Sequence, residues 1–285
     1  TYFYFGNFYR NHKQHKMKNR IIALIDFSVY TNVLQQTTAW FAKALNAEVV
    51  LMHQVAGVFP AFSDTDSRRQ VVNKEIKLAQ QKLEALAQPF DVAPVQYAVS
   101  DVPLPEQIKA LKSDAYADWV FLGLKGTGLL KRWFIGSTAL EVIENNNGLT
   151  VALPQSAGAI VPRRLVIAVS ENYEVNHEQL QQLLAGLKDV ISDIEFITVD
   201  TGNEGEGASE QTLVNLQQTY AAYNSSYHTF TGDNALAEIK NHMQQASHAY
   251  LVLQRGSRSF DDTVLRRFMV NELVYNASIP LVILS

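Results

Sequence analysis

Short apolar runs alternate with amphipathic segments along most of the chain. The run 20–26 is continuous and rich in β-branched residues, which predicts a buried strand, and apolar residues then recur every three or four positions over 32–45, which predicts a helix. The same alternation continues through the first half of the chain. There the expected strands are 20–26, 47–55, 95–100, 118–124 and 149–153, and the expected helices are 32–45, 66–88, 105–113 and one from about 137.

The second half repeats this order of elements. The expected strands are 165–170, 194–199, 227–232, 249–254 and 280–284, with helices over 180–190, from about 209, over 235–243 and from about 263. Continuous apolar strands that alternate with amphipathic helices are typical of a parallel sheet covered on both faces. An internal repeat of more than about 100 residues indicates duplication of a whole domain. We therefore predict an α/β protein of two tandem, doubly wound, five-stranded parallel domains, related by duplication.

The domain bounds follow from composition. The segment 155–163 is rich in small residues and proline and lacks helical periodicity, so we expect it to link a first domain, 18–154, to a second, 164–285. The first twenty residues carry five basic side chains and no acid, without an apolar run long enough for a signal peptide. We expect residues 1–17 to be a basic extension that is disordered or not native.

Bulk composition excludes several classes of protein. A net charge of −4 in 285 residues gives no reason to expect a nucleic-acid partner, and no apolar stretch approaches the roughly 20 residues needed to cross a bilayer. The chain has no cysteine, so it has neither disulfides nor thiolate chemistry. We expect a cytoplasmic protein with no membrane or nucleic-acid partner.

Glycines and hydroxyl residues cluster after the fourth expected strand, in the stretch FLGLKGTGLLKRWFIGST over 121–138. In a parallel sheet, the loops at the carboxyl ends of the strands form the ligand crevice. A glycine-rich loop that leads into a helix offers backbone N–H groups and the positive end of the helix dipole to an anion such as phosphate. The stretch has neither the Gly-Lys-Ser/Thr ending of a P-loop nor the G-x-G-x-x-G spacing of a dinucleotide site.

The spacing that is present, G-x2-G-x9-G-S at Gly123, Gly126, Gly136 and Ser137, resembles the nucleotide-binding signature of the universal stress protein family. ALIDFS over 23–28 is similar to that family's first strand ending in an aspartate, and VVLMHQV over 49–55 to its second strand. YADWVFLGLKG over 116–126 is similar to the segment of the fourth strand. The resemblance covers about residues 18–154, and the second half follows the same layout with weaker motifs.

The resemblance implies that ATP, or AMP or ADP, lies across the ends of strands one and four. We expect this nucleotide to bind with or without Mg²⁺. Asp26 then matches the acid that contacts the adenosine part. The phosphate and ribose cradle matches Gly123, Gly126, Gly136, Ser137 and Thr138. Gln54 stands where the family usually has a valine whose backbone meets adenine, which makes this base contact the one departure in the first half.

The second half departs further from the family pattern. Ser170 stands at the position of Asp26, Gln254 at that of Gly123, and the Gly136 position falls near Arg267. Larger side chains at these positions would fill the cradle. We therefore expect one intact nucleotide site, in the first domain, with the second domain as its pseudo-symmetric packing partner.

Simpler interpretations of the same residues stay open. Thr138 and Glu141 have the spacing of a helix capping box, Asp26 commonly bonds nearby backbone N–H groups in a turn, and His53 suits a half-buried strand end. The histidines show no metal-ligand spacing, and no nucleophile elbow is present. We assign no catalytic or metal-ligating residue.

Three functions remain open at this point. The first is a stress-response regulator whose nucleotide occupancy biases a conformation or a partner surface. The second is a slow Mg²⁺-dependent ATP hydrolase that uses Asp26, although an enzyme is the less favoured class. The third is an interaction module with vestigial sites that acts without nucleotide. The last strands of the halves, 149–153 and 280–284, are the natural edges for an intramolecular pseudo-dimer, in a monomer or a homodimer of chains.

Overall fold

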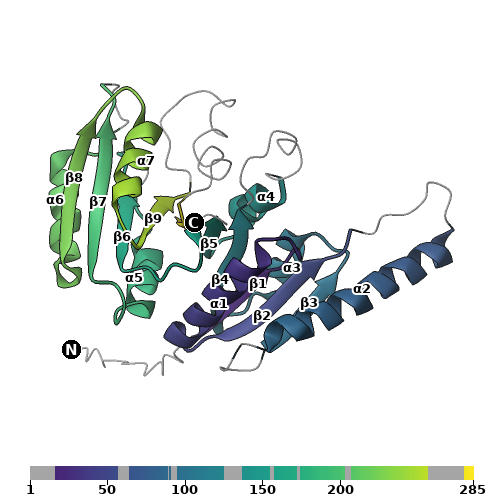
Figure 1. The fold of residues 1–285 in the computed structure, drawn as a ribbon. Coiled ribbons are helices and arrows are strands. Elements are labelled where there is room, and N and C mark those ends of the chain that lie inside the picture. The colour runs from purple at the N-terminus through teal and green to yellow at the C-terminus, as the bar shows by residue number, and fades with distance from the viewer. Residues whose placement is uncertain are drawn as a thin grey trace, which may run out of the picture.

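The computed structural model describes residues 17–56, 64–88, 90, 95–124, 137–154, 157–171, 174–202, 207–255 and 279–285. Its strands are β1 Lys18–Leu24, β2 Glu48–Gln54, β3 Val95–Ser100, β4 Tyr116–Leu124, β5 Leu149–Pro154, β6 Arg164–Ala168, β7 Asp193–Asp200, β8 Ser225–Thr231, β9 Ala249–Gln254 and β10 Leu281–Leu284. Its helices are α1 Thr31–Leu45, α2 Thr65–Ala87, α3 Leu104–Leu111, α4 Ser137–Asn145, α5 His177–Gly186, α6 Glu210–Thr219 and α7 Ala235–Gln245 (Figure 1).

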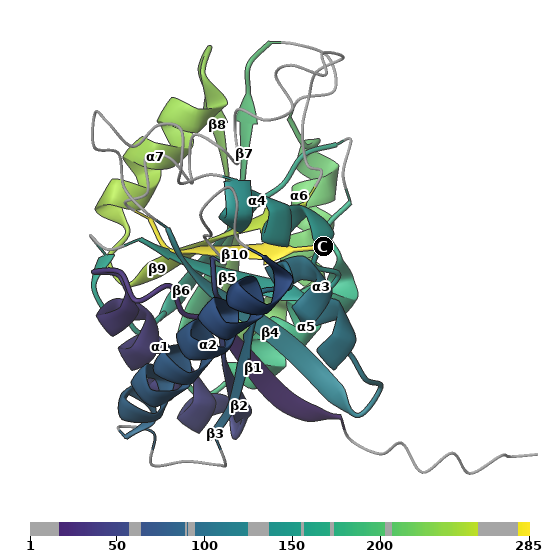
Figure 2. The ribbon, with the colours of Figure 1, turned by 90° about the vertical axis from the view of Figure 1, so that its right-hand side faces the viewer.

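All ten strands form one sheet, in the order β3-β2-β1-β4-β5-β10-β9-β6-β7-β8. Each half is parallel and has the same internal order, with its first strand between its second and fourth. The halves meet where β10 pairs antiparallel with β5, with Val282 opposite Val151. Figure 2 shows β10, in yellow, beside β5 between the two halves. The predicted α/β class is confirmed, and the edge strands pair as predicted, so that one sheet runs through both halves.

Each face of the sheet carries one continuous core because successive strand residues point to opposite faces. Helices α1, α2, α5 and α6 cover one face with side chains that include Phe41 and Leu183. Helices α3, α4 and α7 cover the other with side chains that include Ile108 and Val142. The first core crosses between the halves, since the rings of Phe41 and Tyr250 lie 6.2 Å apart. This packing fixes the halves against each other.

The expected elements are present wherever the chain is described, with small shifts at their ends. The largest is in α5, which ends at Gly186, so Leu187 and Val190 follow the helix although Leu187 stays buried. The helix expected from about residue 263 lies outside the described residues, as does the basic segment 1–16. The proposed domain bounds remain a prediction.

Candidate functional site

A cavity of about 230 Å³ lies at the carboxyl ends of β1, β2 and β4, where the first turn of α4 closes one side. Its floor is apolar and comes from Leu24, Leu104 and Leu122, which belong to the core beneath α3 and α4. Its remaining lining residues are Ile25, Asp26, His53, Gln54, Gly123, Thr138 and Ala139. This is the crevice in which a parallel α/β sheet ordinarily binds its ligand.

Asp26 begins the turn that leads from β1 into α1. Its Oδ1 accepts a hydrogen bond from the backbone N–H of Ser28 at 3.0 Å, and the next residue, Phe27, has the left-handed φ of 54°. The interpretation of Asp26 as a turn residue is therefore confirmed. The carboxylate is also exposed and lines the cavity, so the turn that it stabilises presents it at the mouth of the crevice.

His53 is held by its neighbours. Its Nδ1 lies 2.6 Å from the carbonyl oxygen of Ile25, and its ring lies 4.5 Å from that of Phe27. Because a carbonyl oxygen only accepts hydrogen bonds, Nδ1 must carry a proton and is the donor in this contact. The expectation of a half-buried strand-end histidine is confirmed. The bond ties the end of β2 to the end of β1 and so fixes the cavity wall.

Gly123 occupies a position where a side chain would crowd the crevice. A Cβ there would lie 3.3 Å from Cβ of Tyr30, the residue that precedes α1, which is closer than an ordinary contact. Thr138, the second residue of α4, lines the same cavity. Since α4 begins at Ser137, Thr138 lies inside the helix, and the alternative that it forms the N-cap of a capping box with Glu141 is wrong. The first N–H groups of a helix have no partner within it and can bind an anion.

The structure thus brings together four of the seven predicted binding residues: Asp26, Gln54, Gly123 and Thr138. Ser137 begins α4, but its side chain is not described, and Gly126 and Gly136 lie outside the described residues. The described cavity is smaller than the roughly 300–1,000 Å³ of typical small-molecule sites. It represents the part of the crevice formed by the strand ends.

Sequence reasoning missed the apolar floor and the role of Tyr30. Leu24, Leu104 and Leu122 look like ordinary core residues, and only the sheet register, which aligns Leu24 with Leu122, places them under one cavity. Tyr30 could have been noticed as the residue before an amphipathic helix that lacks a polar N-cap. Its approach to Gly123 joins two distant parts of the sequence, which no local pattern reports.

The equivalent crevice of the second half is arranged differently. The register pairs Ala168 with Leu253, as it pairs Leu24 with Leu122, so Gln254 stands at the position of Gly123, as predicted. Gln254 Oε1 accepts a hydrogen bond of 2.8 Å from the backbone N–H of Asn176, the N-cap of α5. This side chain therefore spans the ends of β9 and the start of α5, where the first half has a glycine. Arg267 lies outside the described residues.

Neither a metal centre nor a membrane span is found in the part of the chain that the structure describes. No three histidine, cysteine or acidic side chains come together there as metal ligands would. No helix in those ranges is both long and apolar enough to cross a bilayer.

Comparison with known proteins gives a family match for the first half of the chain. Residues 17–147, in the first half of the chain, match the model of the Universal stress protein family. A comparison with curated protein sequences gives no significant match.

Solved structures resemble the whole chain. A universal stress protein from Archaeoglobus fulgidus DSM 4304 is similar with a TM-score of 0.68 and 14% identity, over 93% of this chain and 98% of that one. A functionally unknown protein from Pseudomonas aeruginosa PAO1 is similar with a TM-score of 0.59 and 12% identity, over 95% and 93%. The cytoplasmic domain of a prokaryotic cation chloride cotransporter follows with a TM-score of 0.50 and 12% identity, over 93% and 95%. At such identities these likenesses establish the fold alone.

Proposed function

We propose that this protein is a tandem universal stress protein that binds one ATP, ADP or AMP in its first half and acts as a stress-response regulator. The observation that carries the proposal is the cavity that unites Asp26, Gln54, Gly123 and Thr138 in the half of the chain that matches this family. Their separation in sequence, from 26 to 138, makes this convergence at one strand-end crevice informative. The cytoplasm is the location that the cysteine-free composition favours.

The residues present fit an adenine nucleotide in two respects. The missing side chain at Gly123 leaves space that a Cβ would take up against Tyr30, and the first turn of α4 supplies N–H groups toward the cavity. The apolar floor under Asp26 and Gln54 suits the uncharged part of the ligand, with the carboxylate of Asp26 as an acceptor for its hydroxyl or amino groups.

A regulatory role requires only that the nucleotide favour one state of the protein. Ligand at about 100 times its dissociation constant stabilises the state that binds it by about 2.7 kcal/mol. The continuous sheet and the core that crosses it offer a physical connection between the first-half site and the second half. In this proposal the second half, with Gln254 bonded across its crevice, binds no nucleotide and serves as the packing partner.

Thermal melting with and without millimolar ATP and Mg²⁺ tests the proposal. We expect an increase of several degrees in Tm for the wild type and none for Gly123→Val combined with Gly136→Val. The side chain introduced by Gly123→Val would also crowd Tyr30, so the Tm of this variant with ligand is compared with its own Tm without ligand. Gln254→Val is the matched change in the second half, and this variant should keep the full increase in Tm on addition of ATP. Without a shift in the wild type, and with no nucleotide released on denaturation, the protein would be an interaction module that acts through its surface.

Hydrolysis is a separate question, which Asp26→Asn addresses. A slow Mg²⁺-dependent hydrolase that uses this carboxylate would lose turnover in the variant while it kept ATP binding. The variant should keep the turn, since the backbone N–H of Ser28 donates to Oδ1 of Asp26 and an asparagine side-chain oxygen can accept the same hydrogen bond.

A further inference from the structure

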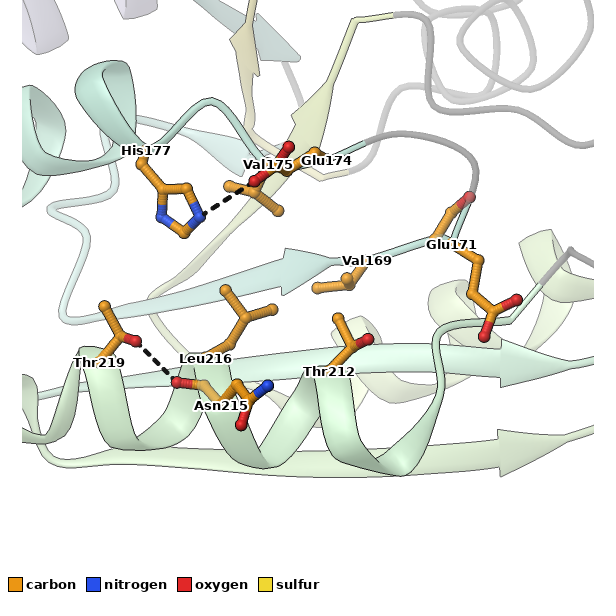
Figure 3. Close-up of a pocket in the computed structure, with 10 residues that line it drawn as sticks. Val169, Glu171, Glu174, Val175, His177, Thr212, Asn215, Leu216 and Thr219 are labelled. Carbon is orange, nitrogen blue, oxygen red and sulfur yellow. Dashed lines mark hydrogen bonds and ion pairs between the residues drawn. The ribbon is translucent and has the colours of Figure 1, made fainter.

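A second and larger cavity, of about 570 Å³, lies in the second half, between α6 and the segment that leads from β6 into α5 (Figure 3). Its lining residues are Val169, Ser170, Glu171, Glu174, Val175, His177, Thr212, Asn215, Leu216 and Thr219, which we call the α5–α6 groove. It lies on the sheet face covered by α1, α2, α5 and α6. None of its lining residues belongs to β9, whose end closes the crevice equivalent to the nucleotide site.

Two rings of the first half have smaller or polar residues at the equivalent positions of the second half. Ile25 and Val169 are equivalent, since their N–H groups donate to the carbonyl oxygens of Met52 and Ile197 at the same point of each sheet. In the first half, the carbonyl of Ile25 is bound by His53, which packs on Phe27.

In the second half the same carbonyl position, at Val169, accepts from the hydroxyl of Thr198 at 2.9 Å. The position of Phe27 is taken by Glu171, which is exposed. In the first half the Phe27 ring also lies 5.0 Å from Lys82 Nζ, and so fills the space between the strand end and α2. A threonine and an outward glutamate leave the corresponding space beside α6 open.

The inner surface of the groove is apolar. Val169, Val175 and Leu216 are each buried and form its floor. Beside them the hydroxyl oxygen of Ser170 is buried and has no hydrogen-bond partner among the described residues. A buried hydroxyl without a partner costs free energy, which a polar group of a ligand or an ordered water would recover.

The mouth of the groove is acidic. Glu171 and Glu174 are exposed carboxylates at its rim, and neither lysine nor arginine occurs among the described lining residues. His177 is anchored at the same rim, with Nδ1 2.8 Å from the hydroxyl of Tyr220 and Nε2 3.9 Å from Glu174 Oε1. Figure 3 shows His177 and Glu174 above the groove and the residues of α6 below it. This charge disfavours phosphates and other anions.

We propose that the α5–α6 groove is a binding site for a small organic cation, an ammonium group carried on an apolar stem. The stem lies on the floor made by Val169, Val175 and Leu216. The ammonium group lies at the acidic rim, whose two carboxylates, Glu171 and Glu174, stand at opposite ends of the groove (Figure 3). The site is independent of the nucleotide site in position and in charge. A regulator with both sites would respond to two chemically opposite ligands.

The test uses the full chain, labelled with ¹⁵N and titrated at pH 8 with phenethylamine, 2-phenylethanol and 3-phenylpropionate. At this pH an alkylamine, like lysine with its ordinary pKa of about 10.4, carries a positive charge. We expect saturable amide shifts over 212–219 and a dissociation constant for the amine about tenfold lower than for the alcohol. Phenylpropionate should bind more weakly than either.

Variants separate charge from shape. Glu171→Gln and Glu174→Gln should each weaken amine binding about two- to fivefold, as expected for partly exposed charge pairs, and together remove the preference over the alcohol. Glu178→Gln, the same charge change on α5 but outside the lining, should have no effect. Two filled variants, Glu171→Phe, which imitates Phe27, and Thr212→Phe, which keeps both carboxylates, should abolish binding of all three probes.

The inference is overturned if phenethylamine gives no saturable shifts, if the alcohol binds equally well, or if the double glutamine variant keeps the tenfold preference. Binding that survives in either filled variant, with its fold verified by circular dichroism, overturns it as well. The glutamine variants change only exposed side chains, so they decide the question even where a filled variant fails to fold. An ATP titration of the same samples reports on the nucleotide site separately.

Discussion

Arg255 reaches from the second half of the chain to the last turn of α4, and its removal should loosen that helix. Nη1 donates to the carbonyl oxygens of Ile143, Glu144 and Asn146, and Nη2 lies 3.2 Å from Asn147 Oδ1. The last carbonyls of a helix have no partner within it and carry the negative end of its dipole. The guanidinium group of Arg255 supplies donors for these carbonyls and a positive charge at the negative end of the dipole, although it comes from a distant part of the sequence.

The size of the effect follows from these contacts. Hydrogen bonds that involve a charged group contribute about 1.5–3 kcal/mol, and a cation at a helix C-terminus about 0.3–1 kcal/mol. After the side-chain entropy that Arg255→Ala releases, we expect a loss of about 2–3 kcal/mol in the free energy of unfolding. Arg255→Lys keeps the charge but loses the forked donors, so its stability should fall between those of the wild type and Arg255→Ala.

Calorimetry measures the loss of stability in Arg255→Ala, and hydrogen exchange shows whether the loss is located in α4. A loss of this size should lower Tm by roughly 4–12 °C, on a scale of about 2–4 °C per kcal/mol for proteins of comparable size. Exchange should accelerate over 137–145, at the wall of the candidate nucleotide site, and stay unchanged over β8. Arg163→Ala, which removes an exposed arginine, should stay within about 0.5 kcal/mol of the wild type. An Arg255→Ala protein with the Tm and α4 exchange of the wild type would refute the reasoning.

Two further predictions concern the base of the first-half sheet. Arg20 and Asp118 form a buried ion pair, with 2.7 Å between Nε and Oδ1 and side chains that are 9% and 8% exposed. Arg20→Met leaves the carboxylate unpaired, so it should lower the free energy of unfolding, measured in urea, by about 3–5 kcal/mol. The double variant Arg20→Met with Asp118→Leu should lose less stability than Arg20→Met alone. Equal losses of stability in the two variants would contradict this explanation. Hydrogen bonds from Lys18 and Tyr116 lower the pKa of Glu48 below its usual 4.5. Their contribution to the stability of the fold is therefore complete above pH 4.5 and is lost as the pH falls through the lowered pKa. The Tm difference between wild type and Glu48→Gln should therefore shrink below pH 4.5, and a difference independent of pH would count against it.

Much of the fold could be predicted because its signals are local. The β-branched runs mark strands such as β1, and the spacing of Leu34, Phe41 and Leu45 marks the buried face of α1. Parallel order then brings the carboxyl ends of β1, β2 and β4 to one edge, so the convergence of Asp26, Gln54 and Gly123 follows from topology.

The remaining features depend on contacts that no periodicity reports. The left-handed φ of Phe27 is unusual for a bulky residue, and it accompanies packing against His53 and Lys82 from two other elements. Beside the α5–α6 groove, Glu171 and Thr198 stand at the positions of Phe27 and His53, and these positions come together only in the folded chain. In the sequence, Arg255 is an ordinary residue that follows a strand. Only the antiparallel pairing of β5 with β10 places its side chain against α4.

Isothermal titration calorimetry of ATP with Mg²⁺ into the wild-type chain tests the central claim most directly, because it counts sites as well as detecting them. We predict one nucleotide per chain, lost in Gly123→Val with Gly136→Val and retained in Gln254→Val. A stoichiometry of zero or two, or binding that survives in the double valine variant and disappears in Gln254→Val, would contradict a single nucleotide site in the first half.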